Sequence, residues 1–166
     1  MKGIESGFTL IELVVTVAVA GILLTVGVPS IKTFITNTDG MAASKLLELD
    51  IIYAHDHAKT QAVDVCLTPI NENTFDDGWT IQEFESTCSD PGAVGGDIIR
   101  ERGSLTSGTS AASTTFKKST PIAFSTEGRA IVSGIITIRT GDCTGNRNVD
   151  LEIYISGQVV SSEVSC

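Results

Sequence analysis

Few residues in this sequence have the types and spacing that chemistry requires. The two histidines, His55 and His57, lie two positions apart in a segment of helix-forming residues, so their side chains point in different directions. No cysteine lies near them, and we predict a solvated helix face with no metal site and no cofactor. Serine and threonine are frequent, but no recognisable nucleophile motif includes either histidine. The sequence therefore favours a protein that is not an enzyme.

The four cysteines are the second chemically distinctive set. All of them, Cys66, Cys88, Cys143 and Cys166, follow the long apolar segment near the N-terminus. An even number of cysteines in an exported segment is typical of disulfides formed in an oxidising compartment. Four cysteines allow three pairings, and we predict the sequence-local one, Cys66–Cys88 and Cys143–Cys166. Zinc is disfavoured because the sequence has no C-x-x-C pair.

The third candidate is Glu12, the only charged residue between Phe8 and Ile31. The stretch from Leu13 to Ile31 carries no charge at all and is long enough to form a membrane-spanning helix. A carboxylate in such surroundings costs several kcal/mol unless another group pairs with it. Glu12 is therefore the candidate functional residue of this segment, and its carboxylate requires a partner.

Three interpretations of this N-terminal segment compete. A signal peptide cleaved after Ala18-Val19-Ala20 would leave an exposed apolar terminus that should aggregate. A plain membrane anchor explains the length of the segment but not Glu12. Processing after Gly7 explains both, because it frees the amine of Phe8, which can pair with Glu12 of a neighbouring chain.

The segment Gly7-Phe8-Thr9-Leu10-Ile11-Glu12 resembles the leader junction of type IV pilins and of type II secretion pseudopilins. The resemblance implies that residues 1–7 are a leader. A prepilin peptidase would cut between Gly7 and Phe8 and methylate the new Phe8 amine. Glu12 would then be the carboxylate that pairs subunits in the filament core.

The resemblance also implies an α+β protein with a pilin-like architecture. We expect a long N-terminal helix with a membrane-spanning part, residues 8–31, and a periplasmic continuation, residues 32–62. Gly21 and Pro29 lie where such pilins carry helix-weakening residues, and Pro29 is expected to kink the helix without ending it. The helix would pack on an antiparallel β-sheet or sandwich formed by residues 63–166, a periplasmic body.

The second half of the helix has an amphipathic pattern. We predict a weak point at Thr38-Asp39-Gly40, after which strong helix formers continue to about Gln61. An apolar stripe should face the body, with Leu46 and Tyr53 beside it: Ala43, Leu47, Ala54 and Ala58. The charged residues Asp50, Asp56 and Lys59 should face water.

After residue 62 the pattern changes to short alternating runs that predict β-strands. The predicted strands are 63–68, 78–84, 98–102, 122–124, 131–139, 149–155 and 158–164. Residues 105–113 are predicted to form a flexible loop, and Trp79 to be half-buried in a sheet. An ordered set of features resembles the GspH/FimT group of minor pilins and pseudopilins: Val65-Cys66, Gly78-Trp79, Ile122-x-Phe124 before Gly128, and a cysteine before the last hairpin at Gly157.

The charge distribution bears on partners. The chain has 20 acids and 11 bases, a net charge of −9, and the excess of acids lies between Glu48 and Glu101. This acidic half either serves solubility alone or meets a more basic neighbouring subunit. Nucleic-acid binding is disfavoured, because FimT-like proteins of DNA uptake are expected to carry arginines after the last hairpin, and residues 157–166 contain neither lysine nor arginine.

The resemblance leads to a specific functional hypothesis. The chain would be a minor pilin of the type IV pilus that primes assembly and sits at or near the filament tip, linking other minor pilins to the major pilin of the shaft. Its other partners would be the prepilin peptidase and the assembly platform of the bacterial inner membrane, which its helix spans before it enters the filament. The alternatives are a GspH-like minor pseudopilin of type II secretion and a FimT-like DNA-uptake pilin.

Overall fold

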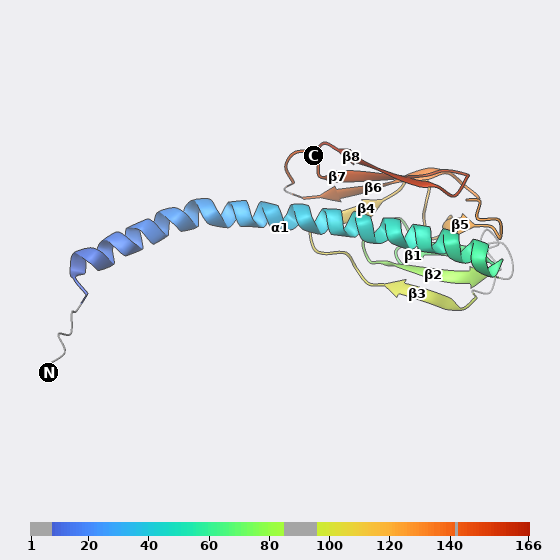
Figure 1. Ribbon diagram of the computed structural model, residues 1–166, viewed down its shortest axis with the longest axis horizontal. Helices are drawn as coiled ribbons and strands as arrows, with labels where there is room; N and C mark the ends of the chain where they lie inside the picture. The colour runs from blue at the N-terminus through green and yellow to red at the C-terminus, as the bar shows by residue number, and fades with distance from the viewer. Residues whose placement is uncertain (1–7, 85–95, 142) are drawn as a thin grey trace. The chain divides into compact units, whose positions relative to one another are not determined.

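The computed structural model describes residues 8–84, 96–141 and 143–166 (Figure 1). The chain divides into two compact units, Met1–Ile35 and Thr36–Cys166. One helix, α1 (Leu10–Gln61), has residues in both. The second unit also contains eight strands within the described residues, which agrees with the predicted α+β class.

The described part of the first unit, residues 8–35, is mostly the N-terminal part of α1, and its only charged residues are Glu12 and Lys32. The best 18-residue window of this helix has a mean hydropathy of 2.4, and none of it is buried within the chain. Two of its threonine hydroxyls, those of Thr16 and Thr25, donate to helix carbonyl oxygens at 2.8 Å, so neither of these donors needs water. By length and composition this helix can cross a membrane. Gly21 and Pro29 both lie within it.

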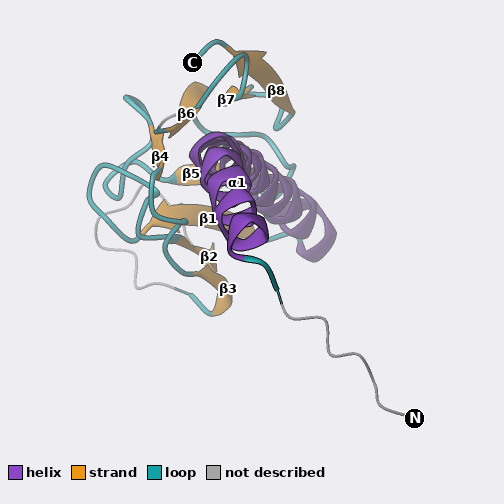
Figure 2. Cartoon of the chain, turned by 90° about the vertical axis from the view of Figure 1, so that its left-hand side faces the viewer, coloured by secondary structure: helices purple, strands orange, loops and turns teal. Residues whose placement is uncertain are grey.

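The second unit contains two four-stranded antiparallel sheets (Figure 2). Sheet A has the strand order β3-β2-β1-β5, formed by β3 (Ile98–Arg102), β2 (Trp79–Phe84), β1 (Asp64–Pro69) and β5 (Ile122–Phe124). Sheet B has the order β4-β6-β7-β8, formed by β4 (Thr109–Ala112), β6 (Gly134–Thr140), β7 (Asn148–Ile153) and β8 (Val159–Val164).

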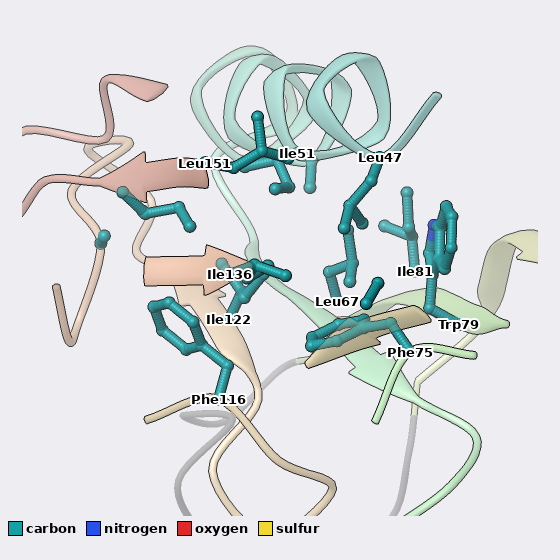
Figure 3. Packing of buried hydrophobic residues seen from close by; sticks show 14 of the residues in the cluster. Leu47, Ile51, Leu67, Phe75, Trp79, Ile81, Phe116, Ile122, Ile136 and Leu151 are labelled. Carbon is teal, nitrogen blue, oxygen red and sulfur yellow. The ribbon is translucent and has the colours of Figure 1, made fainter. Parts of the chain in front are cut away.

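The core of this unit is shared by α1 and both sheets (Figure 3). Helix α1 contributes Leu47, Ala54 and Ala58 of the predicted stripe, together with Ile51, and Ala43 of that stripe is also buried. These side chains meet alternate residues of the strands, which point to one face of each sheet. The strand residues in the cluster include Leu67, Trp79, Ile81 and Ile122 of sheet A, and Ile136, Ile138, Leu151 and Ile153 of sheet B. Burial of one helix stripe by two sheets therefore holds the body together.

Two features of α1 in this unit follow from local chemistry. Gly40, predicted to be a weak point, lies inside the helix and is buried. A Cβ at this position would lie 2.6 Å from Thr140 Cγ2, so the glycine allows α1 to approach β6 closely. The helix ends where Ala62 takes a left-handed conformation, with φ of 53°, and the N–H of Val63 returns to the carbonyl oxygen of Ala58.

The predicted loop at residues 105–113 is wrong in its second half, which forms β4. The short side chains there offer little apolar surface, but Ala111 is fully buried. Its carbonyl oxygen accepts the N–H of Phe75 at 2.8 Å, and its own N–H donates to Asp76 Oδ1 at 2.6 Å. Contacts with residues distant in the chain, rather than local propensity, make this segment a strand.

The hairpin before β8 packs against the C-terminal turns of α1. This close packing should make the stability of the body sensitive to a side chain at Gly157. Gly157 has a φ of +87°, and a Cβ there would lie 2.2 Å from the carbonyl oxygen of Gly128 and 2.5 Å from His55 Cδ2. We expect Gly157→Ala to lower the free energy of unfolding by about 1–3 kcal/mol. Gly103→Ala is the matched control, because a Cβ there meets nothing within 4 Å. Equal urea midpoints for the two variants would contradict this account.

Candidate functional site

The first candidate site is the N-terminal end of α1. Thr9 precedes the helix, and its Oγ1 accepts the backbone N–H of Glu12 at 3.3 Å. Thr9-Leu10-Ile11-Glu12 has the T-x-x-E spacing of a helix N-cap, so the same residues that resemble a leader junction also start the helix. Glu12 thus lies in the first turn, where the positive end of the helix dipole favours a carboxylate.

The residues around Glu12 form an exposed apolar surface. The side chains of Phe8, Leu10 and Ile11 are 75%, 81% and 69% exposed within the chain, and Glu12 is exposed too. Within the described residues, no cation forms an ion pair with Glu12. Gly7, the residue before the predicted cleavage, lies outside the described residues. A carboxylate on an apolar surface of this kind is suited to pair with a cation from another molecule.

The second candidate site is a buried carboxylate in the body, Asp50 of α1. Three side chains from sheet A donate hydrogen bonds to it. Trp79 Nε1 lies 2.9 Å from Oδ2, and Arg100 Nη1 lies 2.6 Å from Oδ1. Arg102 binds both oxygens, with Nε 2.8 Å from Oδ2 and Nη2 3.1 Å from Oδ1. We call Asp50, Trp79, Arg100 and Arg102 the Asp50 cluster.

This cluster corrects two predictions. Asp50 was expected to face water and is 0% exposed, and Trp79 was expected to be half-buried and is also 0% exposed. Strand geometry explains the convergence, because Arg100 and Arg102 lie two apart on one face of β3, and Trp79 of β2 is the register partner of Arg102. The guanidinium carbon of Arg100 also lies 3.8 Å from the ring centroid of Tyr53 on α1.

Electrostatics in the cluster keep Asp50 ionised. Burial alone would raise the pKa of Asp50, but the hydrogen bonds from Arg102, Arg100 and Trp79 outweigh it and hold the pKa below its ordinary value. The pKa of Arg102 is raised, chiefly by its hydrogen bond to Asp50. Both oxygens of the buried carboxylate accept hydrogen bonds, so Asp50 is not available as a catalytic acid or base. The cluster instead links α1 to β2 and β3.

The histidines also differ from the sequence prediction of a solvated helix face. His57 Nε2 lies 2.6 Å from Glu83 Oε1 of β2, and His55 Nδ1 lies 2.9 Å from Asp56 Oδ1. Their side chains are only 18% and 20% exposed. Because α1 turns both of them toward the sheets and loops of the body, they hold structural contacts. Within residues 8–84, 96–141 and 143–166, no group of three His, Cys, Asp or Glu side chains is placed to hold a metal ion.

Comparisons with known protein families agree with this division of the chain. Residues 4–28 match the prokaryotic N-terminal methylation motif, which includes the capped start of α1 and Glu12. Residues 43–157 match the family described as type II transport protein GspH, a span that contains the Asp50 cluster and most of both sheets. The chain belongs to the GspH family. Its members are pilin-like structural subunits, and the methylation motif with its apolar helix is typical of membrane-anchored pilins.

Solved structures show the same fold. Two crystal forms of the type IV minor pilin FimU from Pseudomonas aeruginosa PAO1 are similar to this GspH-family chain. The first is 11% identical, with a TM-score of 0.59, and the match covers 78% of this chain and 92% of FimU. The second is 13% identical, with a TM-score of 0.56, and covers 74% and 91%. No curated protein sequence matches the chain.

The structure describes three of the four cysteines of this GspH-family chain, Cys66, Cys143 and Cys166. Cys143 and Cys166 form a disulfide that ties the residues after β8 to the β6–β7 connection. The N–H of Cys166 donates to the carbonyl oxygen of Gly145 at 2.9 Å, and Asn148 Nδ2 donates to that of Ser165 at 3.1 Å. Cys66 is buried in β1, and its predicted partner Cys88 lies outside the described residues.

Proposed function

We propose that this chain is a minor pilin of the type IV pilus. It primes filament assembly and lies at or near the filament tip, where it links other minor pilins to the major pilin of the shaft. The observation that carries the proposal is the presence in one chain of a methylation motif on an exposed apolar helix and a GspH-family body. The fold shared with FimU, over 92% of FimU, supports the choice of a pilus.

The proposed assembly mechanism uses the N-terminal site. The prepilin peptidase cuts between Gly7 and Phe8 and methylates the Phe8 amine, and α1 holds the chain in the inner membrane with the body in the periplasm. Glu12 then pairs with the Phe8 amine of an adjacent subunit. Both charges lie on apolar surfaces, so pairing removes a cost of several kcal/mol that either would carry alone in the bilayer. The apolar faces of neighbouring helices then pack as the chain leaves the membrane.

A second candidate function is a minor pseudopilin of a type II secretion system. The description of the matching family as a type II transport protein favours it. The same N-terminal mechanism would apply, but the filament would be a periplasmic pseudopilus. Binding of DNA is not supported, because residues 157–166, which include β8, present Glu163 and no lysine or arginine to a phosphate backbone.

Immunogold electron microscopy of intact cells tests the proposal. An antibody against the body should label the ends of surface filaments, and deletion of the gene should reduce the number of filaments. Restoring the gene is the control. Gold distributed evenly along the shafts would contradict the tip position. Loss of protein secretion on deletion, with surface filaments unchanged, would favour the pseudopilus.

A further inference from the structure

Within the described residues, the two sheets of the body have four edge strands, and three of them are protected. Residues 74 and 75 cover β4, with the N–H of Phe75 bound to Ala111 and a bridge from Thr74 to Ala112. The segment after β5 covers that strand, because the N–H of Ile131 binds the carbonyl oxygen of Ala123. β3 carries three charges among its five residues and a register shift opposite β2. Charges, bulges and covering segments are the usual means of blocking an edge.

In the part of the chain that the structure describes, the fourth edge, β8, has almost none of these protections. Its six residues, VVSSEV, contain one charge, Glu163, and no proline. Its pairing with β7 runs through six consecutive residue pairs without a bulge. Val160, Ser161, Ser162 and Glu163 are exposed. β8 is therefore a regular, accessible strand edge.

The register shows which backbone groups this edge presents. The N–H of Tyr154 donates to the carbonyl oxygen of Gln158 at 2.9 Å, so this residue pair is hydrogen-bonded. Hydrogen-bonded and non-hydrogen-bonded pairs alternate along antiparallel strands. Val160, Ser162 and Val164 therefore direct their N–H and C=O groups to β7. Val159, Ser161 and Glu163 direct theirs away from the sheet.

A groove lies beside this row of unpaired backbone groups. It has a volume of about 260 Å³ and is lined by α1 residues, including Lys45 and Glu48, and by Ser161 and Glu163 of β8. Ser161 and Glu163 face the inner side of sheet B, because their register partners, Leu151 and Val149, are buried. An added strand would thus place alternate side chains in the groove between β8 and α1.

We propose that the β8 edge accepts an extended strand from a different pilin-like subunit, which enlarges sheet B by one strand. Paired backbone groups would supply affinity, and side chains in the groove would supply specificity. The partner strand carries a lysine or arginine that faces Glu163, because Lys45 is already paired with Glu48 at 3.0 Å and the groove keeps a net negative charge. A second copy of this chain is disfavoured, since two chains of charge −9 would meet at like-charged edges.

This inference rests on the proposed function only in requiring a filament that supplies the neighbouring subunit. Hydrogen exchange of the backbone amides tests it on the full chain, once purified in detergent and once in isolated filaments. The amides of Val159, Ser161 and Glu163 should exchange rapidly in detergent and at least tenfold more slowly in filaments. Those of Val160 and Ser162 should be protected in both and serve as internal controls. Equally rapid exchange of the first three amides in both samples would overturn the proposal.

Variants at the edge provide an independent measurement of the same contact. Ser161→Pro removes an outward N–H, and proline is tolerated on an edge strand whose N–H faces away from the sheet. Ser161→Ala keeps that N–H and is the matched control. We expect Ser161→Pro to reduce incorporation into sheared filaments at least fivefold relative to Ser161→Ala. Glu163→Lys should have a similar effect relative to Glu163→Gln, and it does not constrain the backbone of β8.

The outcomes separate this proposal from the proposed function. If the unchanged protein is absent from every filament fraction, the proposed function fails. If it is incorporated but its β8 amides stay unprotected, or if both variant pairs incorporate equally, only the strand pairing fails.

Discussion

Replacing Asp50 by asparagine is expected to lower the free energy of unfolding of the body by about 3 kcal/mol, because breaking a buried charge pair leaves its partners uncompensated. Asparagine has nearly the same shape, but it is neutral and would turn an amide N–H group toward arginine donors. Arg100 and Arg102 are about one third exposed and can recover some hydration, which places the expected loss at the lower end of the range for buried pairs. Nε1 of Trp79 is buried, so it cannot recover hydration in this way.

The chain carries its own probe for this experiment. Trp79 is the only tryptophan and belongs to the Asp50 cluster, so its fluorescence during urea unfolding reports on the affected residues. Asp56→Asn is the matched control, since Asp56 lies on the same helix with a side chain that is 68% exposed. It should change the free energy of unfolding by less than about 0.5 kcal/mol. If the two variants unfold at the same urea concentration, the Asp50 cluster does not stabilise the body.

The contribution of Asp50 should depend on pH in a defined direction. Its pKa is lower in the folded protein than in the unfolded chain. Its contribution is therefore complete above the ordinary aspartate value of about 3.9 and is lost as the pH falls through the lower pKa of the folded state. The difference in stability between the native protein and Asp50→Asn should be constant above about pH 5 and should shrink in more acidic solution. A difference that widens with acid would contradict this pKa direction.

The sequence predicted the elements of this fold well because their signals are local. An uncharged stretch long enough to span a bilayer, an apolar stripe at helical spacing and alternating strands each appear within one window of the chain. Seven strands lie close to their predicted positions. β4 was missed because its four residues with short side chains, TSAA, form a strand only through partners distant in the chain. The strand order also depends on pairings between distant segments and could not be read from the sequence.

The Asp50 cluster was missed for a related reason, although the sequence contains a signal for it. Asp50 lies three residues after Leu47 and four before Ala54, so it falls on the predicted apolar stripe. Asp50 was nevertheless predicted to face water, because an unpaired aspartate is rarely buried. Arg100 and Arg102, at alternate positions of a predicted strand, were the residues that could compensate it. Only the fold shows that they meet Asp50.

The prediction with the largest expected effect on assembly concerns Glu12. We expect Glu12→Ala to leave removal of the leader intact, because the cleaved bond lies between Gly7 and Phe8. The same change should reduce incorporation into filaments at least tenfold, which corresponds to about 1.4 kcal/mol. Two unit charges about 4 Å apart at an effective dielectric constant near 20 attract each other by about 4 kcal/mol, so the pairing energy is sufficient for this effect.

Two further variants make the result specific. Glu12→Gln keeps the size and polarity of the side chain, so a defect shared with Glu12→Ala assigns the effect to the negative charge. Gly7→Ala acts one step earlier and should leave an uncut precursor in the membrane, as shown by N-terminal sequencing. Sheared filaments containing normal amounts of Glu12→Gln would contradict the pairing of Glu12 with a neighbouring amine. A terminus that still begins at Phe8 in Gly7→Ala would contradict the peptidase step. Because cleavage and incorporation are read separately, a failure of one leaves the other open to test.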